Sequence, residues 1–245
     1  MLKKLSLRSA MTSFLCVLLS GCLATTGGPA TENAEAVPDV AADSRLTEGA
    51  DANFFSGSGW QSCAVAGGGT AALCLAMGGQ PVKCLAGAVA VCGVAMGANY
   101  YLELRRSQYS NATQRLQEMT KDVKKDSEKI KMRSETMGRV LKDDKKRIAD
   151  LNKSIKAKKI STENAKKELA SLDKNVQYMR KELSGMKEKV ANYEKVLAAE
   201  KGDSKGKSPA LTEVEKEIRV LNSQVAKLEK EINSTYSLRD AITLG

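Results

Sequence analysis

The chain contains no histidine, one tryptophan and three phenylalanines among its 245 residues. Without an imidazole, the chain has no histidine to bind a metal ion, to act as a general base or to activate a serine or cysteine nucleophile. With so few aromatic rings, it also has little material for a wide globular core. No phosphate-binding loop or nucleophile elbow is present, and the carboxylates lie among lysines. We therefore expect a protein that is not an enzyme and that uses no cofactor and no metal.

The formal net charge of +10 is unevenly distributed along the chain. Residues 23–62 carry six acidic residues and only Arg45, whereas residues 101–245 carry 34 Lys and Arg against 23 Asp and Glu. Such a basic region attracts anionic partners. Few residues of 22–59 are large and apolar, so this acidic stretch is predicted to be a disordered tether.

The first 22 residues have the pattern of a secretion signal. Lys3, Lys4 and Arg8 precede an apolar stretch from Met11 to Leu19, which is too short to span a bilayer. The run Leu19, Ser20, Gly21 and Cys22 then resembles the lipobox of Gram-negative bacterial lipoproteins. An ordinary signal peptide with a chance cysteine is the alternative.

That resemblance implies removal of residues 1–21 and acylation of Cys22. In such lipoproteins an Asp after the cysteine favours the inner membrane, whereas this chain has Leu23. The resemblance therefore implies a lipid anchor in the outer membrane, with the body of the chain in the periplasm. In that compartment nucleic acid is not an expected partner, whereas peptidoglycan is one anionic partner available.

Residues 60–99 form a segment rich in Gly, Ala, Val and Cys in which Lys83 is the only charged residue. The sequence from Gly78 to Pro81 indicates a turn, which predicts a helical hairpin. Small residues recur at every fourth position on its two arms: Ala64, Gly68, Ala72 and Ala76, then Ala86 and Ala90, with Gly93 and Gly97. This spacing resembles the glycine zippers of proteobacterial envelope lipoproteins. Re-entry into a membrane, burial in an oligomer, a two-span hairpin and a loose linker remain alternatives.

Four cysteines lie in this segment: Cys63, Cys74, Cys84 and Cys92. An even number in an oxidising compartment favours disulfides. Two cysteines on the same helical arm would be about 12–16 Å apart, too far for a bond. Folding at Gly79 favours Cys74 with Cys84 and Cys63 with Cys92. The spacings match no usual zinc site.

The region 100–245 has the heptad spacing of coiled-coil helices. Two apolar series alternate steps of three and four: Leu169, Leu172, Val176, Met179, Leu183, Met186 and Val190, then Leu211, Val214, Ile218, Leu221, Val225, Leu228 and Ile232. The repeat continues from Val190 to Tyr193 and Leu197. The residues at 202–210 break the helix, and a loop that short suits antiparallel neighbours. The predicted class is all-α: a Gly/Ala-rich helical hairpin, then long coiled-coil helices folded antiparallel.

The stretch from 100 to 160 has a weaker repeat. Leu116, Met119, Val123, Ile130 and Met137 share one register, but Asp126 and Arg133 occupy core positions in it. Ser161, Thr162 and Glu163 indicate a new helix start after a break near 158–162. Such a break predicts three helices side by side, whereas a continuous helix would give a long oligomeric rod.

These features together favour a structural or scaffolding lipoprotein of the cell envelope, with self-association or an envelope protein as its partner. A pore-associated protein whose zipper inserts into lipid is the alternative from another class. An accessory of an envelope secretion or export machine is a third hypothesis.

Lipidation gives the first testable prediction. Cys22→Ala removes the thiol that the acyl transfer requires, so the variant should accumulate as an unprocessed precursor without acyl label. Feeding cells with radiolabelled palmitate measures this directly. Label that still enters the variant would show that the lipobox assignment is wrong.

Overall fold

The computed structural model describes residues 40–52, 54–55, 97–203 and 208–244. The predicted signal peptide, Cys22, the four internal cysteines and all predicted zipper positions except Gly97 lie outside these residues. The described part is helical and contains no strand, which confirms the predicted all-α class. Its helices are α1 (Ser44–Thr47), α4 (Ala98–Gln108), α5 (Ala112–Lys156), α6 (Thr162–Asp203) and α7 (Pro209–Asp240).

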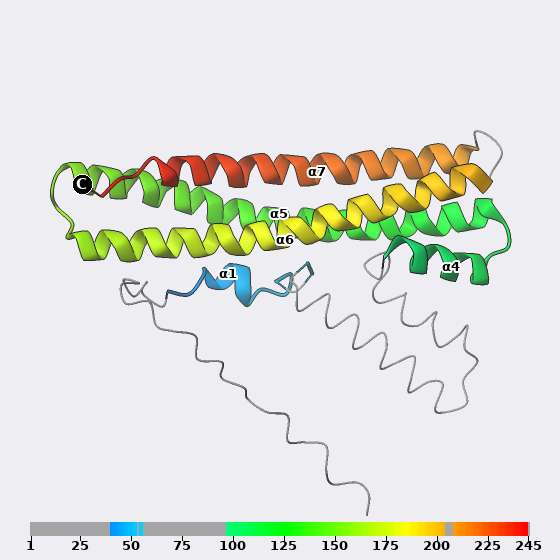
Figure 1. The fold of residues 1–245 in the computed structure, drawn as a ribbon, viewed down its shortest axis with the longest axis horizontal. Helices are drawn as coiled ribbons and strands as arrows, with labels where there is room; N and C mark the ends of the chain where they lie inside the picture. The colour runs from blue at the N-terminus through cyan, green and yellow to red at the C-terminus, as the bar shows by residue number, and fades with distance from the viewer. Residues whose placement is uncertain (1–39, 53, 56–96, 204–207, 245) are drawn as a thin grey trace, which may run out of the picture. The chain divides into compact units, whose positions relative to one another are not determined.

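The three long helices α5, α6 and α7 lie side by side (Figure 1). Helix α6 runs antiparallel to α5 and to α7, while α5 and α7 run in the same direction. Whether the helices supercoil as a coiled coil stays a prediction.

The helix ends have clear chemical causes. Asn111 accepts a hydrogen bond from the backbone N–H of Thr113 and starts α5, and Ser208 accepts one from Leu211 before Pro209 starts α7. The Ser161 hydroxyl accepts a hydrogen bond from the Asn164 N–H at the start of α6. The helices therefore break at both predicted places, which gives three helices rather than one continuous rod.

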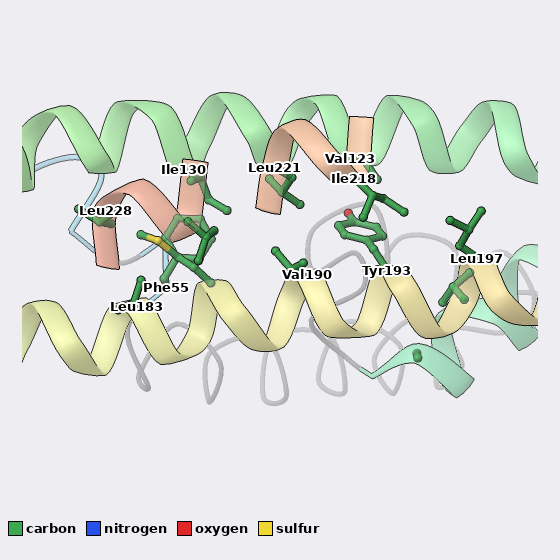
Figure 2. Packing of buried hydrophobic residues seen from close by; sticks show 14 of the residues in the cluster. Phe55, Val123, Ile130, Leu183, Val190, Tyr193, Leu197, Ile218, Leu221 and Leu228 are labelled. Carbon is green, nitrogen blue, oxygen red and sulfur yellow. The ribbon is translucent and has the colours of Figure 1, made fainter. Parts of the chain in front are cut away.

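The core of the bundle is formed by the predicted heptad residues. All fourteen residues of the two apolar series have a relative exposure of 7% or less. All of them except Leu169 and Leu172 share one cluster with the α5 side chains Leu116, Met119, Val123, Ile130 and Met137, which are also buried. Figure 2 shows Val123 and Ile130 from α5, Ile218, Leu221 and Leu228 from α7, and Leu183, Val190 and Tyr193 from α6 filling the space between the helices.

A second, smaller core lies at the α5–α6 turn. Ile148 and Leu151 of α5 pack with Leu169 and Leu172 of α6 and with Ile242, which follows α7. Ile155 and Ile160 are partly buried against this cluster. Figure 1 shows the α5–α6 turn and the residues after α7 at the same end of the bundle.

Three features differ from the sequence prediction. Residues 40–52 and 54–55 were predicted to belong to a disordered tether, but they include α1 and pack on the bundle. Gly97 was predicted to lie on a helical stripe, but it precedes α4 with φ 96° and ψ 150°, a conformation that essentially only glycine adopts. The helical region also begins at Ala98 and is interrupted at 109–111, a break that the heptad pattern did not predict.

Candidate functional site: a docking face on α5 and α6

The residues before the bundle dock on one side of α5 and α6. We call residues 40–52 and 54–55 the strap; its helix α1 contacts both α5 and α6, and α4 contacts α6. In Figure 1 the strap and α4 lie along the side of the bundle opposite to α7. The contacts of this docking face are polar to an unusual degree, because several charged side chains within it are buried.

Arg133 is the centre of the docking face. Its side chain is fully buried, and its Nε and Nη2 donate to the two carboxylate oxygens of Glu182 on α6, at 2.5 and 2.9 Å. Nη2 also donates to the backbone carbonyl of Leu46 at 2.6 Å, and Nη1 to that of Arg45 at 3.4 Å. A buried charge is costly unless it is paired and its remaining donors find acceptors. The strap supplies those acceptors.

The electrostatics of the Arg133–Glu182 pair reflect its burial. Burial raises the pKa of the Glu182 carboxyl, and the hydrogen bonds and charge of Arg133 oppose that shift. For Arg133, burial acts to lower the pKa, but the opposing effects, led by the hydrogen bond and charge of Glu182, leave the pKa raised. The guanidinium therefore stays charged, and its planar fork fits the carboxylate with two parallel hydrogen bonds.

Asn175 and Asp144 form a second buried contact with the strap. Asn175 is fully buried; its amide nitrogen lies 3.1 and 3.0 Å from the Asp144 carboxylate oxygens. Its amide oxygen accepts a hydrogen bond from the backbone N–H of Asp43 at 2.7 Å. The Asp43 carboxylate caps α1 and pairs with Arg45 at 2.8 Å. The hydrogen bond from Arg45 lowers the pKa of Asp43, although burial opposes the shift.

Apolar contacts complete the docking of the strap. Leu46, Ala52 and Phe55 are buried. The Tyr178 hydroxyl donates to the carbonyl of Ala52 at 3.3 Å. At Gly185 of α6 the strap backbone passes so close that an added Cβ would lie 2.9 Å from the carbonyl oxygen of Phe55. Glycine at this position therefore permits the close approach.

Helix α4 docks farther along α6 through two tyrosines. Tyr101 is fully buried and meets Tyr193 edge to face, with ring centroids 6.1 Å apart at 85°. The Tyr193 hydroxyl donates to Asp126 at 2.7 Å, and Lys189 pairs with the same carboxylate at 2.8 Å. The Tyr101 hydroxyl donates to Asp122. Burial raises the pKa of both tyrosines, which therefore remain protonated donors.

The connection from α4 to α5 is held in the same manner as the strap. Arg115 is buried and donates to both carboxylate oxygens of Glu200 at 2.7 and 2.9 Å. Its Nη1 donates to the carbonyls of Tyr109 and Ser110, each at 3.1 Å. Two arginines of α5 thus each bind a glutamate of α6 and backbone carbonyls of a docked segment.

The charged pairs between α5 and α6 share one register. They are Arg115–Glu200, Asp126–Lys189, Arg133–Glu182 and Arg147–Glu168. In each pair the α5 residue lies as many positions before the Ala157–Lys158 turn as its partner lies after it. The pairs therefore fix how the two antiparallel helices are aligned. Mirror spacing of opposite charges about the turn was a sequence signal that could have identified these residues.

Neither a metal site nor a membrane span is found among the described residues. No cluster of three or more His, Cys, Asp or Glu side chains there could hold a metal ion. No helix in the same ranges is both long and apolar enough to cross a membrane.

Comparison of the chain with protein-family models, with curated proteins and with solved structures finds no match. The evident chemistry of the arrangement is the fixing of the strap and α4 to the bundle.

The close approach at Gly185 gives a matched pair of variants. In Gly138→Ala a Cβ meets nothing within 4 Å, so the better helix propensity of alanine should raise the free energy of unfolding by about 1 kcal/mol. Gly185→Ala makes the same change but forces the strap away from α6, so this gain should be lost. Denaturant unfolding measures stability, and the rate of trypsin cleavage after Arg45 measures strap docking. Equal stability and equal cleavage in the two variants would contradict the docked strap.

Asp144 gives a prediction on pH. Burial raises its pKa, opposed by the hydrogen bond from Asn175 and the charge of Arg147, while Asp43 of the strap adds to the rise. Because the folded chain then binds this proton more tightly than the unfolded chain, ionised Asp144 costs stability above its folded pKa, and acid removes the cost. Asp144→Asn cannot ionise. The melting temperature of the variant minus that of the parent should thus be more positive at neutral than at acidic pH.

The exposed Asp150→Asn serves as the control for the loss of one carboxylate on α5. A difference for Asp144→Asn that is constant with pH, or larger in acid, would contradict the burial argument.

Proposed function

We propose that this protein is a scaffolding lipoprotein of the cell envelope. Acylated Cys22 anchors the chain in the outer membrane, and the helical bundle projects into the periplasm as a structural rather than catalytic body. The lipobox pattern from Leu19 to Cys22 supports the anchor. The long helices of the described residues support the structural role.

The docked strap is the observation that carries this proposal. If the whole predicted tether of residues 22–59 were unbound, a load at the anchor would reach the bundle only through the start of its helices. Instead, backbone groups of Asp43, Arg45 and Leu46 are bound by side chains of α5 and α6. A load applied at the N-terminal side is thus passed to the middle of α5 and α6, which suits a structural body that is held through its anchor.

A pore-associated or secretion-accessory role is the second candidate, and one observation favours it. Residues 56–96 connect Phe55, which lies against Gly185, to the segment that begins with Gly97 and includes Tyr101, which lies against Tyr193. These two positions on α6 are about 12 Å apart along the helix. Whatever path the apolar segment takes, its ends are fixed near one another, as an excursion into a membrane and back would require.

The experiment that tests the scaffold combines fractionation with photo-crosslinking in intact Gram-negative cells. A photoreactive residue is placed at exposed Lys131 on α5, Lys181 on α6 or Ser223 on α7, with buried Leu221 as the control. The chain should fractionate with the outer membrane. At least one exposed position should give a crosslinked adduct of defined mass. The yield of this adduct should be unchanged in Gly138→Ala and lower in Gly185→Ala.

A chain that washes from membranes with salt and forms no adduct from any exposed position would overturn the scaffold. Dye release from vesicles by the purified acylated protein would instead favour the pore-associated role.

A further inference from the structure

The α5–α6 turn is rich in exposed lysines. Between residues 153 and 167 the chain has six lysines and one glutamate. Lys156, Lys158 and Lys159, which we call the lysine tip, are all exposed. Within the described residues, no carboxylate forms an ion pair with any of these three. The lysine tip therefore contributes positive charge that no ion pair among the described residues neutralises.

Lys158 has a backbone conformation that a lysine adopts only at a cost in stability. Its φ is +52°, which makes it the one non-glycine residue with positive φ in the described ranges. The N–H of Lys158 donates to the carbonyl of Ile155 at 3.0 Å, and that of Lys159 to Ser154 at 2.9 Å. This pair of bonds is the Schellman motif, whose left-handed position usually holds glycine. A lysine here costs stability relative to glycine, because its Cβ is crowded in that conformation.

The surroundings of the lysine tip indicate the kind of partner. Ile155 and Ile160 are only partly buried beside it, so apolar surface and positive charge occur together at the end of the helical hairpin. At Arg133 and Arg115, two buried carboxylates are each bound by the planar fork of an arginine. Lysines instead present mobile, hydrated point charges, which suit a diffuse anionic surface rather than one oriented ligand.

We propose that the lysine tip is a binding surface for anionic phospholipid headgroups. The ammonium groups approach the phosphates, while the partly exposed isoleucines reach the interfacial layer. A basic residue near an anionic bilayer strengthens binding about fivefold, so three together account for about 100-fold. The attraction falls as salt screens it. This inference goes beyond the proposed scaffold and does not depend on acylation of Cys22.

The test uses the mature chain from residue 22 with Cys22→Ser, so that no acyl chain contributes to binding. A fluorescent non-canonical amino acid at exposed Asn152 reports energy transfer to headgroup-labelled lipid, and so reports the tip even if other parts of the chain bind lipid. Vesicles contain phosphatidylglycerol with phosphatidylethanolamine, or phosphatidylcholine alone. Purified peptidoglycan sacculi form a separate sedimentation arm.

Two triple variants remove equal charge. Lys156→Gln, Lys158→Gly and Lys159→Gln together change the tip, while Lys131→Gln, Lys181→Gln and Lys230→Gln change exposed lysines on three different helices. Energy transfer to the phosphatidylglycerol vesicles should be strong for the parent, should need about 100-fold more lipid for the tip variant, and should hardly change for the control. Lys158→Gly alone should weaken binding while raising the melting temperature, which separates loss of binding from loss of folding.

Equal weakening by the two triple variants would show that only net charge matters and would overturn the proposal. Equal transfer to neutral vesicles, or binding to sacculi without transfer to anionic vesicles, would overturn it as well. If the chain gives no adduct and washes from membranes in cells, while the purified chain still binds anionic vesicles through its tip, the proposed scaffold function is wrong and the lysine-tip proposal stands.

Discussion

The pairing of two buried arginines on α5 with two buried glutamates on α6 is the constraint on which the described structure depends. Removing one partner of such a pair leaves an uncompensated charge, which typically costs about 3–5 kcal/mol. Shifting α6 by one heptad would place Arg133 opposite Lys189 or Asp126 opposite Glu182. Apolar heptads alone tolerate such shifts, because every heptad looks alike. The buried charges therefore select one alignment.

That same pairing explains why the strap and α4 dock where they do. An arginine has five N–H donors, and a glutamate satisfies only some of them. Arg133 and Arg115 direct the remainder at backbone carbonyls of the strap and of the α4–α5 connection. The docked segments thereby complete the burial of the charges, and the charges in turn hold segments too short and too polar to fold alone. The alignment of α5 with α6 and the docking of the strap and α4 therefore depend on the same buried charges.

Much of the bundle could be predicted from sequence, because apolar residues at a 3.5-residue spacing have few alternatives to burial between helices. The breaks near 158–162 and 202–210 followed from capping residues and from Gly and Pro. The strap could not be predicted in this way, since Leu46, Ala52 and Phe55 follow no period and most of its contacts use the backbone. Asp126 and Arg133 looked like flaws in the heptad series when that series was considered alone. Their role as ion-pair partners depends on Lys189 and Glu182, which are more than 45 residues away in the sequence.

The mirror placement of the charged pairs about Ala157 and Lys158 also has a kinetic consequence. Closing a loop costs more entropy as the loop lengthens, but a loop that is extended from an already closed one adds little. Arg147 and Glu168 are closest to the turn, and Arg115 and Glu200 are farthest from it. We expect the hairpin to close from its turn outward, each pair bringing the next within reach. A protein with such nested contacts can assemble helices 45 and 42 residues long without a search for their alignment.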